Sequence, residues 1–164
     1  MSIASGRSRQ MSDAGADSGG SLEPIVCTLL VSRAPAEAFR AFTQDLGSWW
    51  DPRLTPDAST FRGAELEPRV GGSVRFVHDG NAGYEFAKVT SWRPGEQVGM
   101  VFWLALDPKH PTTLTVDFSP SPRGSLVRLA HGGWTADNAA LRSKFGEWPS
   151  LLGRYAAHLD RDEG

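Results

Sequence analysis

Tryptophan is the residue type whose number and spacing in this sequence most suggest a binding function. The chain has six Trp residues against two Tyr. Aromatic walls suit flat apolar ligands, and each indole N–H offers one oriented hydrogen-bond donor. Trp103 and Trp148, with one of the adjacent pair Trp49 and Trp50, are therefore candidate walls of a cavity. Alternatively, these indoles only fill the space between a sheet and a helix, since buried Trp is common.

His131 is the histidine whose position best fits such a site. It alternates with Val127 and Leu129, so all three are predicted on the buried face of one strand. A neutral imidazole there could contact a ligand or act as a general base. The alternative is a core histidine bonded to backbone or to a neighbouring carboxylate. His78, beside a turn, is expected to be exposed. Because no second His or acid stands at ligand spacing, we predict no metal.

Three charged side chains are candidates for contacting the polar end of a ligand. Glu67 and Arg69 flank a proline at a turn, and Glu85 is the other acid that period-two counting can place inside. Glu67 and Arg69 could instead form a structural salt bridge that pins the following Gly-Gly turn. The aromatic neighbours of Glu85 compete with it for the same face of the strand.

The common enzyme motifs are missing from the sequence. It contains no Gly-x-Ser-x-Gly elbow, no phosphate loop with Gly-Lys-Ser/Thr and no Gly-x-Gly-x-x-Gly fingerprint. No nucleophile has an obvious base. We therefore predict no catalytic residue and no cofactor, and we favour a binding domain over an enzyme.

The composition is that of an ordinary globular protein. The 164 residues predict one domain, and 40% hydrophobic residues can fill one core. A net charge of −2 argues against a nucleic-acid binder. No apolar run is long enough to span a membrane, and the single Cys27 is expected to be a buried small hydrophobe in a strand. These features predict a cytoplasmic protein without nucleic-acid or membrane partners.

The first residues differ in composition from the rest. Residues 1–21 consist mainly of Ser, Gly, Ala, Asp and Arg, and such a segment cannot bury enough surface to offset its ordering entropy. We predict a disordered tail over 1–21 and a single domain over 22–164. Met11 is an alternative start to Met1.

The element expected to position the aromatic residues is a long C-terminal helix from about residue 137 to 160. Large apolar residues recur there in steps of four and three, which places them on one stripe of a helix. Pro149 interrupts this pattern, and Gly146 precedes it closely. Of the two possibilities, a kink or a new helix with Pro149 in its first turn, the continuous stripe favours a kink or brief offset. The stripe comprises Leu141, Phe145, Trp148, Leu152, Tyr155 and Leu159.

Most of the chain before that helix is expected to form strands. A helical segment over 35–47, starting at a proline and ending at a glycine, follows the first strand, and residues 51–60 are expected to form a loop. This order predicts an α+β fold, with a curved antiparallel sheet of about seven strands around the C-terminal helix and two short helices after the first strand. A gap between such a sheet and its helix is where small-molecule sites form. The expected strands cover 25–31, 61–67, 73–78, 84–92, 98–106, 113–118 and 125–131.

Several short stretches together resemble a known group of proteins. They are Pro35…Phe39…Phe42, Trp49-Trp50, Leu66-Glu67-Pro68-Arg69-Val70-Gly71-Gly72, Trp92-Arg93-Pro94, Phe102-Trp103, Leu129-Ala130-His131-Gly132-Gly133-Trp134 and Gly146-Glu147-Trp148. Over about residues 22–160 the chain resembles the START-like superfamily, and within it the bacterial domains similar to the activator of Hsp90 ATPase. The resemblance implies a helix-grip fold with an interior cavity. Members bind lipids, hormones or polyketides, and some catalyse cyclisation.

The leading hypothesis is a non-catalytic domain whose cavity binds a small apolar or aromatic molecule. One alternative is an enzyme of cyclase, aromatase or hydrolase type, which needs an acid to meet His131 inside the pocket. Another is a protein-interaction module with a chaperone or regulator as partner. That module predicts a large apolar patch on the outer face of the sheet, where Thr113, Thr115 and Arg128 argue against one. The expected ligand contacts are Trp49 or Trp50, Phe76, Trp103, His131, Trp148 and Leu152.

Overall fold

The protein folds as one curved antiparallel sheet that wraps around a C-terminal helix. The computed structural model describes residues 21–163. All but the last residue of the predicted tail over 1–21 therefore lies outside the described residues. The sheet has the order β1-β7-β6-β5-β4-β3-β2. Its strands are β1 (Ile25–Val31), β2 (Phe61–Leu66), β3 (Ser73–His78), β4 (Asn81–Arg93), β5 (Gln97–Phe102), β6 (Thr112–Ser121) and β7 (Gly124–Gly132).

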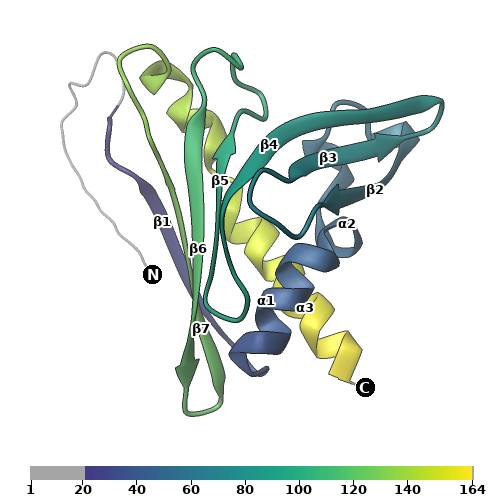
Figure 1. Cartoon of the computed structure of the whole chain (residues 1–164), viewed down its shortest axis with the longest axis vertical. Coiled ribbons are helices and arrows are strands. Elements are labelled where there is room, and N and C mark those ends of the chain that lie inside the picture. Colours follow the sequence, from purple (N-terminus) through teal and green to yellow (C-terminus); the bar gives the residue numbers. More distant parts are fainter. Residues whose placement is uncertain (1–20, 164) are drawn as a thin grey trace.

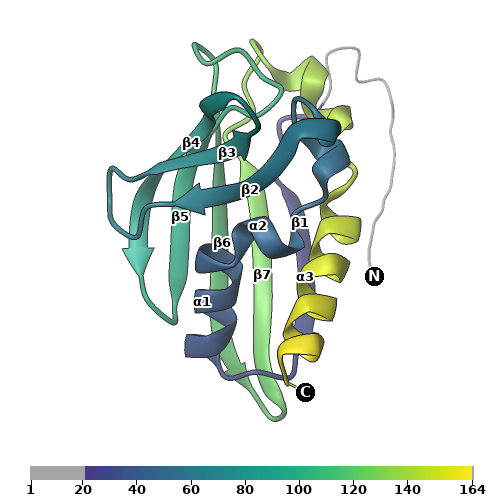
Figure 2. The same cartoon turned by 90° about the vertical axis from the view of Figure 1, so that its right-hand side faces the viewer.

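Helices lie on the concave side of this sheet. Strands β1, β7, β6 and β5 run along the long axis of the molecule, and β4, β3 and β2 swing away from them (Figure 1). Figure 2 shows α1 and α3 on the same face of the sheet, with α1 in front of β6 and α3 in front of β1. The α-helices are α1 (Pro35–Gln44), α2 (Leu46–Trp49) and α3 (Trp148–Glu163), and the 3-10 helices are η1 (Pro52–Leu54), η2 (Ala58–Thr60) and η3 (Ala139–Phe145). The predicted α+β helix-grip architecture is confirmed.

The alternation of apolar and polar residues produces the buried face. On β6, Leu114, Val116 and Phe118 are buried, whereas Thr115 and Asp117 between them are only half-buried. On β7, Leu129 is completely buried and Arg128 is exposed. Because side chains of a strand point alternately to its two faces, each strand contributes one apolar row to the core.

The C-terminal helix is broken rather than kinked, so the favoured interpretation of Pro149 was wrong. The 3-10 helix η3 ends at Phe145, and α3 begins at Trp148. Pro149 has no N–H, and its ring would clash with the carbonyl of Phe145 in a continuous helix. In the first turn of α3 the missing N–H has no consequence. The break sets the direction in which α3 leaves Trp148.

Other boundaries and burial states also differ from expectation. Strand β5 ends at Phe102, and the chain then turns, with Ala105 at a φ of 60°. The expected loop over 51–60 contains η1 and η2. His78 is buried, because its ring packs edge-on against Phe61 and its Nδ1 lies 3.1 Å from the hydroxyl of Thr60.

Two further observations concern the single cysteine and the length of the helices. Cys27 is half-buried and free, and burial raises the pKa of its thiol. None of the helices described between residues 21 and 163 is long and apolar enough to cross a membrane.

Helix α3 is tied to the helices after β1 as well as to the sheet. The hydroxyl of Tyr155 donates a hydrogen bond of 2.6 Å to the carbonyl of Ala38 on α1. Nε of Arg154 donates one of 2.9 Å to the carbonyl of Trp49 on α2. Tyr155 also packs against the rings of Phe42 and Trp49. The middle of α3 is therefore tightly packed against α1 and α2.

Candidate functional site

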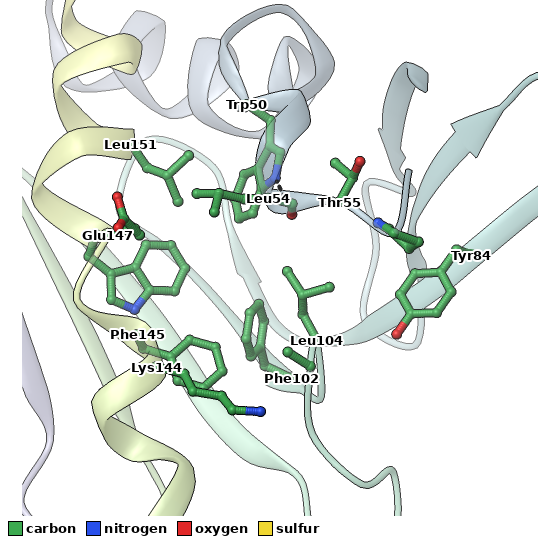
Figure 3. A pocket seen from close by; sticks show the side chains of 13 residues that line it. Trp50, Leu54, Thr55, Tyr84, Phe102, Leu104, Lys144, Phe145, Glu147 and Leu151 are labelled. Atoms are coloured by element: carbon green, nitrogen blue, oxygen red, sulfur yellow. Dashed lines mark hydrogen bonds between the residues drawn. The ribbon is translucent and has the colours of Figure 1, made fainter. Parts of the chain in front are cut away.

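A pocket of about 410 Å³ lies at the N-terminal end of α3. Four parts of the chain surround it, namely η3 with the start of α3, the segment through η1, strand β4, and the end of β5 with the turn after it. Figure 3 shows the side chains of these segments converging on one space. The lining residues are Trp50, Leu54, Thr55, Pro56, Tyr84, Phe102, Leu104, Ala105, Lys144, Phe145, Glu147, Trp148 and Leu151.

Aromatic rings form the inner walls. Trp50 and Trp148 meet nearly at right angles, with ring centroids 6.1 Å apart. Phe102 lies 6.0 Å from Trp148 and 6.2 Å from Phe145 by the same measure. These edge-to-face and tilted arrangements are the ones that aromatic quadrupoles favour. They leave ring faces and edges toward the pocket, which suits a flat apolar guest.

The indole N–H groups of the walls are already bonded within the protein. Nε1 of Trp50 donates to the carbonyl of Leu54 at 3.1 Å. Nε1 of Trp148 donates to Nδ1 of His131 at 3.1 Å. An indole has only this one donor. Neither tryptophan therefore offers a hydrogen bond to a molecule in the pocket, contrary to the expectation that an indole would.

His131 is buried behind the wall and does not line the pocket. Its side chain is completely inaccessible, and Nε2 lies 2.8 Å from the hydroxyl of Thr112. Burial, with a smaller contribution from the charge of Arg142, lowers the pKa of His131 to about 4. The imidazole is therefore neutral at physiological pH, and Trp148 stands between it and the pocket.

The other predicted apolar contacts divide into wall residues and residues further out. Trp50 and Trp148 line the pocket. Trp49, the other member of the adjacent pair, is buried in the core, with its N–H donated to the carbonyl of Ala41 at 3.3 Å. Phe76, another expected ligand contact, is completely buried with its ring centroid 5.6 Å from that of Trp50, and it does not line the pocket.

Trp103 and Leu152, which were expected to contact the ligand, are not among the residues that line the pocket. Trp103 follows the end of β5, and its carbonyl accepts the N–H of Leu106 in a turn. The residue before it, Phe102, takes the place in the wall. On α3 it is Leu151, one position before the predicted Leu152, that faces the pocket. Leu152 is buried in the hydrophobic core instead.

The three polar candidates also lie away from the pocket. Glu67 accepts the backbone N–H of Ser73 at 2.8 Å and lies 3.4 Å from Arg69. The bond from Ser73 is the main reason why the pKa of Glu67 is lowered. Glu85 pairs with Lys88 at 3.3 Å. For Glu67 and Arg69 the geometry is that of a structural turn.

Sequence reasoning did not predict the polar rim of the pocket. Its members are Tyr84, Lys144 and Glu147, all exposed. Within the described part of the chain, none of these three side chains makes a hydrogen bond or ion pair. Lys144 and Glu147 lie beside the helical stripe, and the stripe alone gave no signal that they would border a cavity. In residues 21–163 no group of three or more His, Cys, Asp or Glu could hold a metal ion.

The curved sheet gripping α3, with a pocket between them, defines a helix-grip domain of the START-like superfamily. Over residues 33–160 the chain matches the model of the family described as Activator of Hsp90 ATPase homolog 1-like protein. That match covers well over half of the chain, and the protein belongs to this family. Comparison with curated proteins found no significant match.

Solved structures share the fold at low sequence identity. MLL2253 from Mesorhizobium loti is 22% identical, with a TM-score of 0.60 over 84% of this chain and 97% of its own. The Aha1 dimer from Colwellia psychrerythraea is 23% identical, with a TM-score of 0.60 over 86% and 98%. An anthrahydroquino-gamma-pyrone synthase, Txn09, is 22% identical, with a TM-score of 0.60 over 82% and 96%. At these identities the likeness supports the fold alone.

Proposed function

We propose that this protein binds a small apolar or aromatic molecule in the pocket at the N-terminal end of α3. The observation that carries the proposal is the character of the walls. Trp50, Phe102, Phe145 and Trp148 surround the pocket, and the N–H groups of both indoles are used within the protein. A pocket lined by apolar groups with a few convergent polar ones is the usual form of a ligand site.

The volume and the rim narrow the class of ligand. At about 410 Å³ the pocket is near the lower end of the usual range for ligand sites, about 300–1,000 Å³. A compact ring system fits this space better than a long acyl chain. Hydrogen bonds to the ligand are expected only at the rim, where Tyr84 and Lys144 offer donors and Glu147 an acceptor. We propose a ligand with an apolar body and a polar end directed toward solvent.

Direct titration tests this proposal. Two fluorescent probes are suitable, the neutral N-phenylnaphthylamine and the anionic anilinonaphthalene sulfonate, with probe emission and Trp quenching followed together. We expect saturable binding of at least one probe. Native mass spectrometry of freshly purified protein then identifies any co-purifying ligand.

A blocking variant links the binding to this pocket. Leu104→Trp places a larger ring in the lining and should abolish probe binding. The matched control is Leu126→Trp, which introduces the same residue on the exposed outer side of β7. A wild-type protein that binds neither probe, or a Leu104→Trp protein that binds as well as wild type, contradicts the proposal.

The alternative functions stay predictions. The enzyme hypothesis needed His131 and an acid to meet in the pocket, and the pocket lining does not include His131. The likeness to a synthase keeps ring closure as a chemistry to assay once a ligand is known. For a protein partner, the family description and the exposed Val26 and Leu30 on β1 are the available support. A cytoplasmic location is part of the proposal and rests on the sequence.

A further inference from the structure

One chain of hydrogen bonds links strand β6 to the pocket wall through His131. The Trp148 indole N–H is 3.1 Å from Nδ1 of His131. Nε2 of His131 is 2.8 Å from Oγ1 of Thr112, and that hydroxyl donates to the carbonyl of Phe102 at 3.0 Å. All three side chains are buried. The chain thus begins at a pocket wall, Trp148, and ends at the backbone of another, Phe102.

The chemistry of the groups fixes the direction of every bond. An indole nitrogen can only donate, so Nδ1 of His131 must accept and cannot carry a proton. A neutral imidazole then carries its proton on Nε2, which must donate to Thr112. Thr112 accepts that proton and uses its own hydrogen for the carbonyl of Phe102. Only one tautomer of His131 satisfies all three bonds.

Aromatic rings pack closely around the imidazole. Its centroid is 4.7 Å from that of Trp134, 4.8 Å from Phe145 and 5.1 Å from Phe102. The carbonyl of His131 also accepts the Trp134 indole N–H at 2.9 Å. His131 is therefore a rigid acceptor at a fixed place behind the pocket.

Trp148 needs such an acceptor because of where it stands in the chain. It is the first residue of α3, directly after the break that follows Phe145. No preceding turn of the same helix restrains its side chain, and the bond to His131 is the only hydrogen bond of its side chain within the described residues. Rotation of this indole would change the shape of the cavity.

We propose that His131 is a positioning residue of the pocket, whose Nδ1 holds the Trp148 indole in the orientation that shapes the cavity without touching the bound molecule. This inference rests on the proposed binding function. It assigns His131 a role different from the ligand contact and the general base expected from the sequence.

The tautomer can be measured without any ligand. Long-range proton–nitrogen correlation spectra of nitrogen-labelled wild-type protein at neutral pH should show His131 protonated on Nε2, with an unprotonated Nδ1. The Trp148 indole N–H signal should be slow to exchange with solvent. A proton on Nδ1, or an indole N–H that exchanges as fast as an exposed one, would overturn the inference.

Variants of His131 test the consequence for binding, with N-phenylnaphthylamine as the probe. His131→Phe keeps an apolar ring but removes the acceptor, and it should weaken probe binding about tenfold, as expected for one lost hydrogen bond. His131→Asn retains an acceptor oxygen close to the Nδ1 position and should recover most of the affinity. Val127→Ala, on the same buried face of β7, is the control for general loss of packing.

A double-mutant cycle separates positioning from independent structural roles. Trp148→Phe has no N–H, so adding His131→Phe to it should cost little further affinity. Fully additive losses, or a His131→Phe protein that binds like wild type, contradict the inference while leaving the binding function intact. A wild type that binds neither probe instead refutes the proposed function, and the pocket role with it. Should His131→Phe fail to fold, the wild-type spectra still test the tautomer of His131. Probe binding by Thr112→Val, which removes the bond to Nε2, then tests the positioning role.

Discussion

At the scale of single residues, polar atoms in and around the pocket fall into two groups. Those of the walls are bonded within the protein, as the indoles of Trp50 and Trp148 show. Those of the rim, on Tyr84, Lys144 and Glu147, make no hydrogen bond or ion pair within the described residues. A bound molecule can therefore gain contact area inside and hydrogen bonds only at the entrance.

Acidification should destabilise the wild-type protein more than the His131→Phe variant. The pKa of His131 is about 4 in the folded protein, against an ordinary value of about 6.5 in an unfolded chain. Between these values the unfolded state binds a proton that the folded state does not. The free energy of unfolding therefore falls as pH falls, by about 3 kcal/mol over the whole interval. Urea denaturation from about pH 7 to about pH 4 measures this, and equal slopes for both proteins would refute the prediction.

Lys144 should favour ligands with an anionic end. We expect Lys144→Ala to weaken binding of anilinonaphthalene sulfonate by about two- to fivefold, the effect of one exposed charge pair. Binding of the neutral N-phenylnaphthylamine should not change. Lys109→Ala, in an exposed loop outside the pocket lining, is the matched control. If both probes are affected equally, Lys144 acts through the shape of the pocket instead of its charge.

At the scale of elements, two interruptions of regular structure are informative, and the first of them lies beside the pocket. The break between η3 and α3 lies between Phe145 and Trp148, both of which line the pocket. The turn between β2 and β3 is closed by Glu67, which accepts the N–H of Ser73. Each interruption contains a residue that restricts the backbone, Pro149 after the break and Gly72 in the turn.

Gly72→Ala should destabilise the fold through the turn between β2 and β3. A Cβ at this position would lie only 2.4 Å from the carbonyl oxygen of Glu67, which is backbone and cannot move aside. We expect a loss of about 2–4 kcal/mol in the free energy of unfolding, measured by urea denaturation. Gly146→Ala is the control, because nothing lies within 4 Å of a Cβ there and its backbone is already helical. Equal effects of the two substitutions would contradict this account.

At the scale of the whole molecule, α3 is the element that connects the tightly packed helices to the pocket. Its middle packs on α1 and α2 through Tyr155 and Arg154, and its first residues border the pocket. The tightly packed middle anchors the helix, while its N-terminal end meets a space that the side chains do not fill. Stability and binding are therefore located in different parts of one element.

Tyr155 should contribute to stability without affecting binding. Tyr155→Ala removes a completely buried ring that contacts Phe42 and Trp49, and it should cost about 3–5 kcal/mol. Tyr155→Phe loses only the hydrogen bond to Ala38 and should cost about 1 kcal/mol. Thermal denaturation gives both values. Tyr84→Phe, at the exposed rim, is expected to leave stability unchanged, and a loss as large as that of Tyr155→Phe would be inconsistent with this division.

Much of this architecture was predictable because it depends on local patterns. Alternation along β6 and β7 and the apolar stripe of the C-terminal segment each report which face of an element is buried. Those patterns and the aromatic content made Trp148 and one of the pair Trp49 and Trp50 candidate wall residues, but they did not say which of the pair. The break at Pro149 was open to two interpretations because the stripe runs through it.

The sequence by itself determined the antiparallel sheet, the helix that it grips and the aromatic character of the space between them, since periodicity and residue type act over a few neighbouring positions. Only the tertiary structure decided that His131 stands behind Trp148, that Trp49 packs away from the pocket, and that Leu151 and Lys144 border it. The physical reason is that a pocket is formed by segments distant in the chain. Rotating α3 by one residue, or ending a strand a few residues early, exchanges which side chain reaches it.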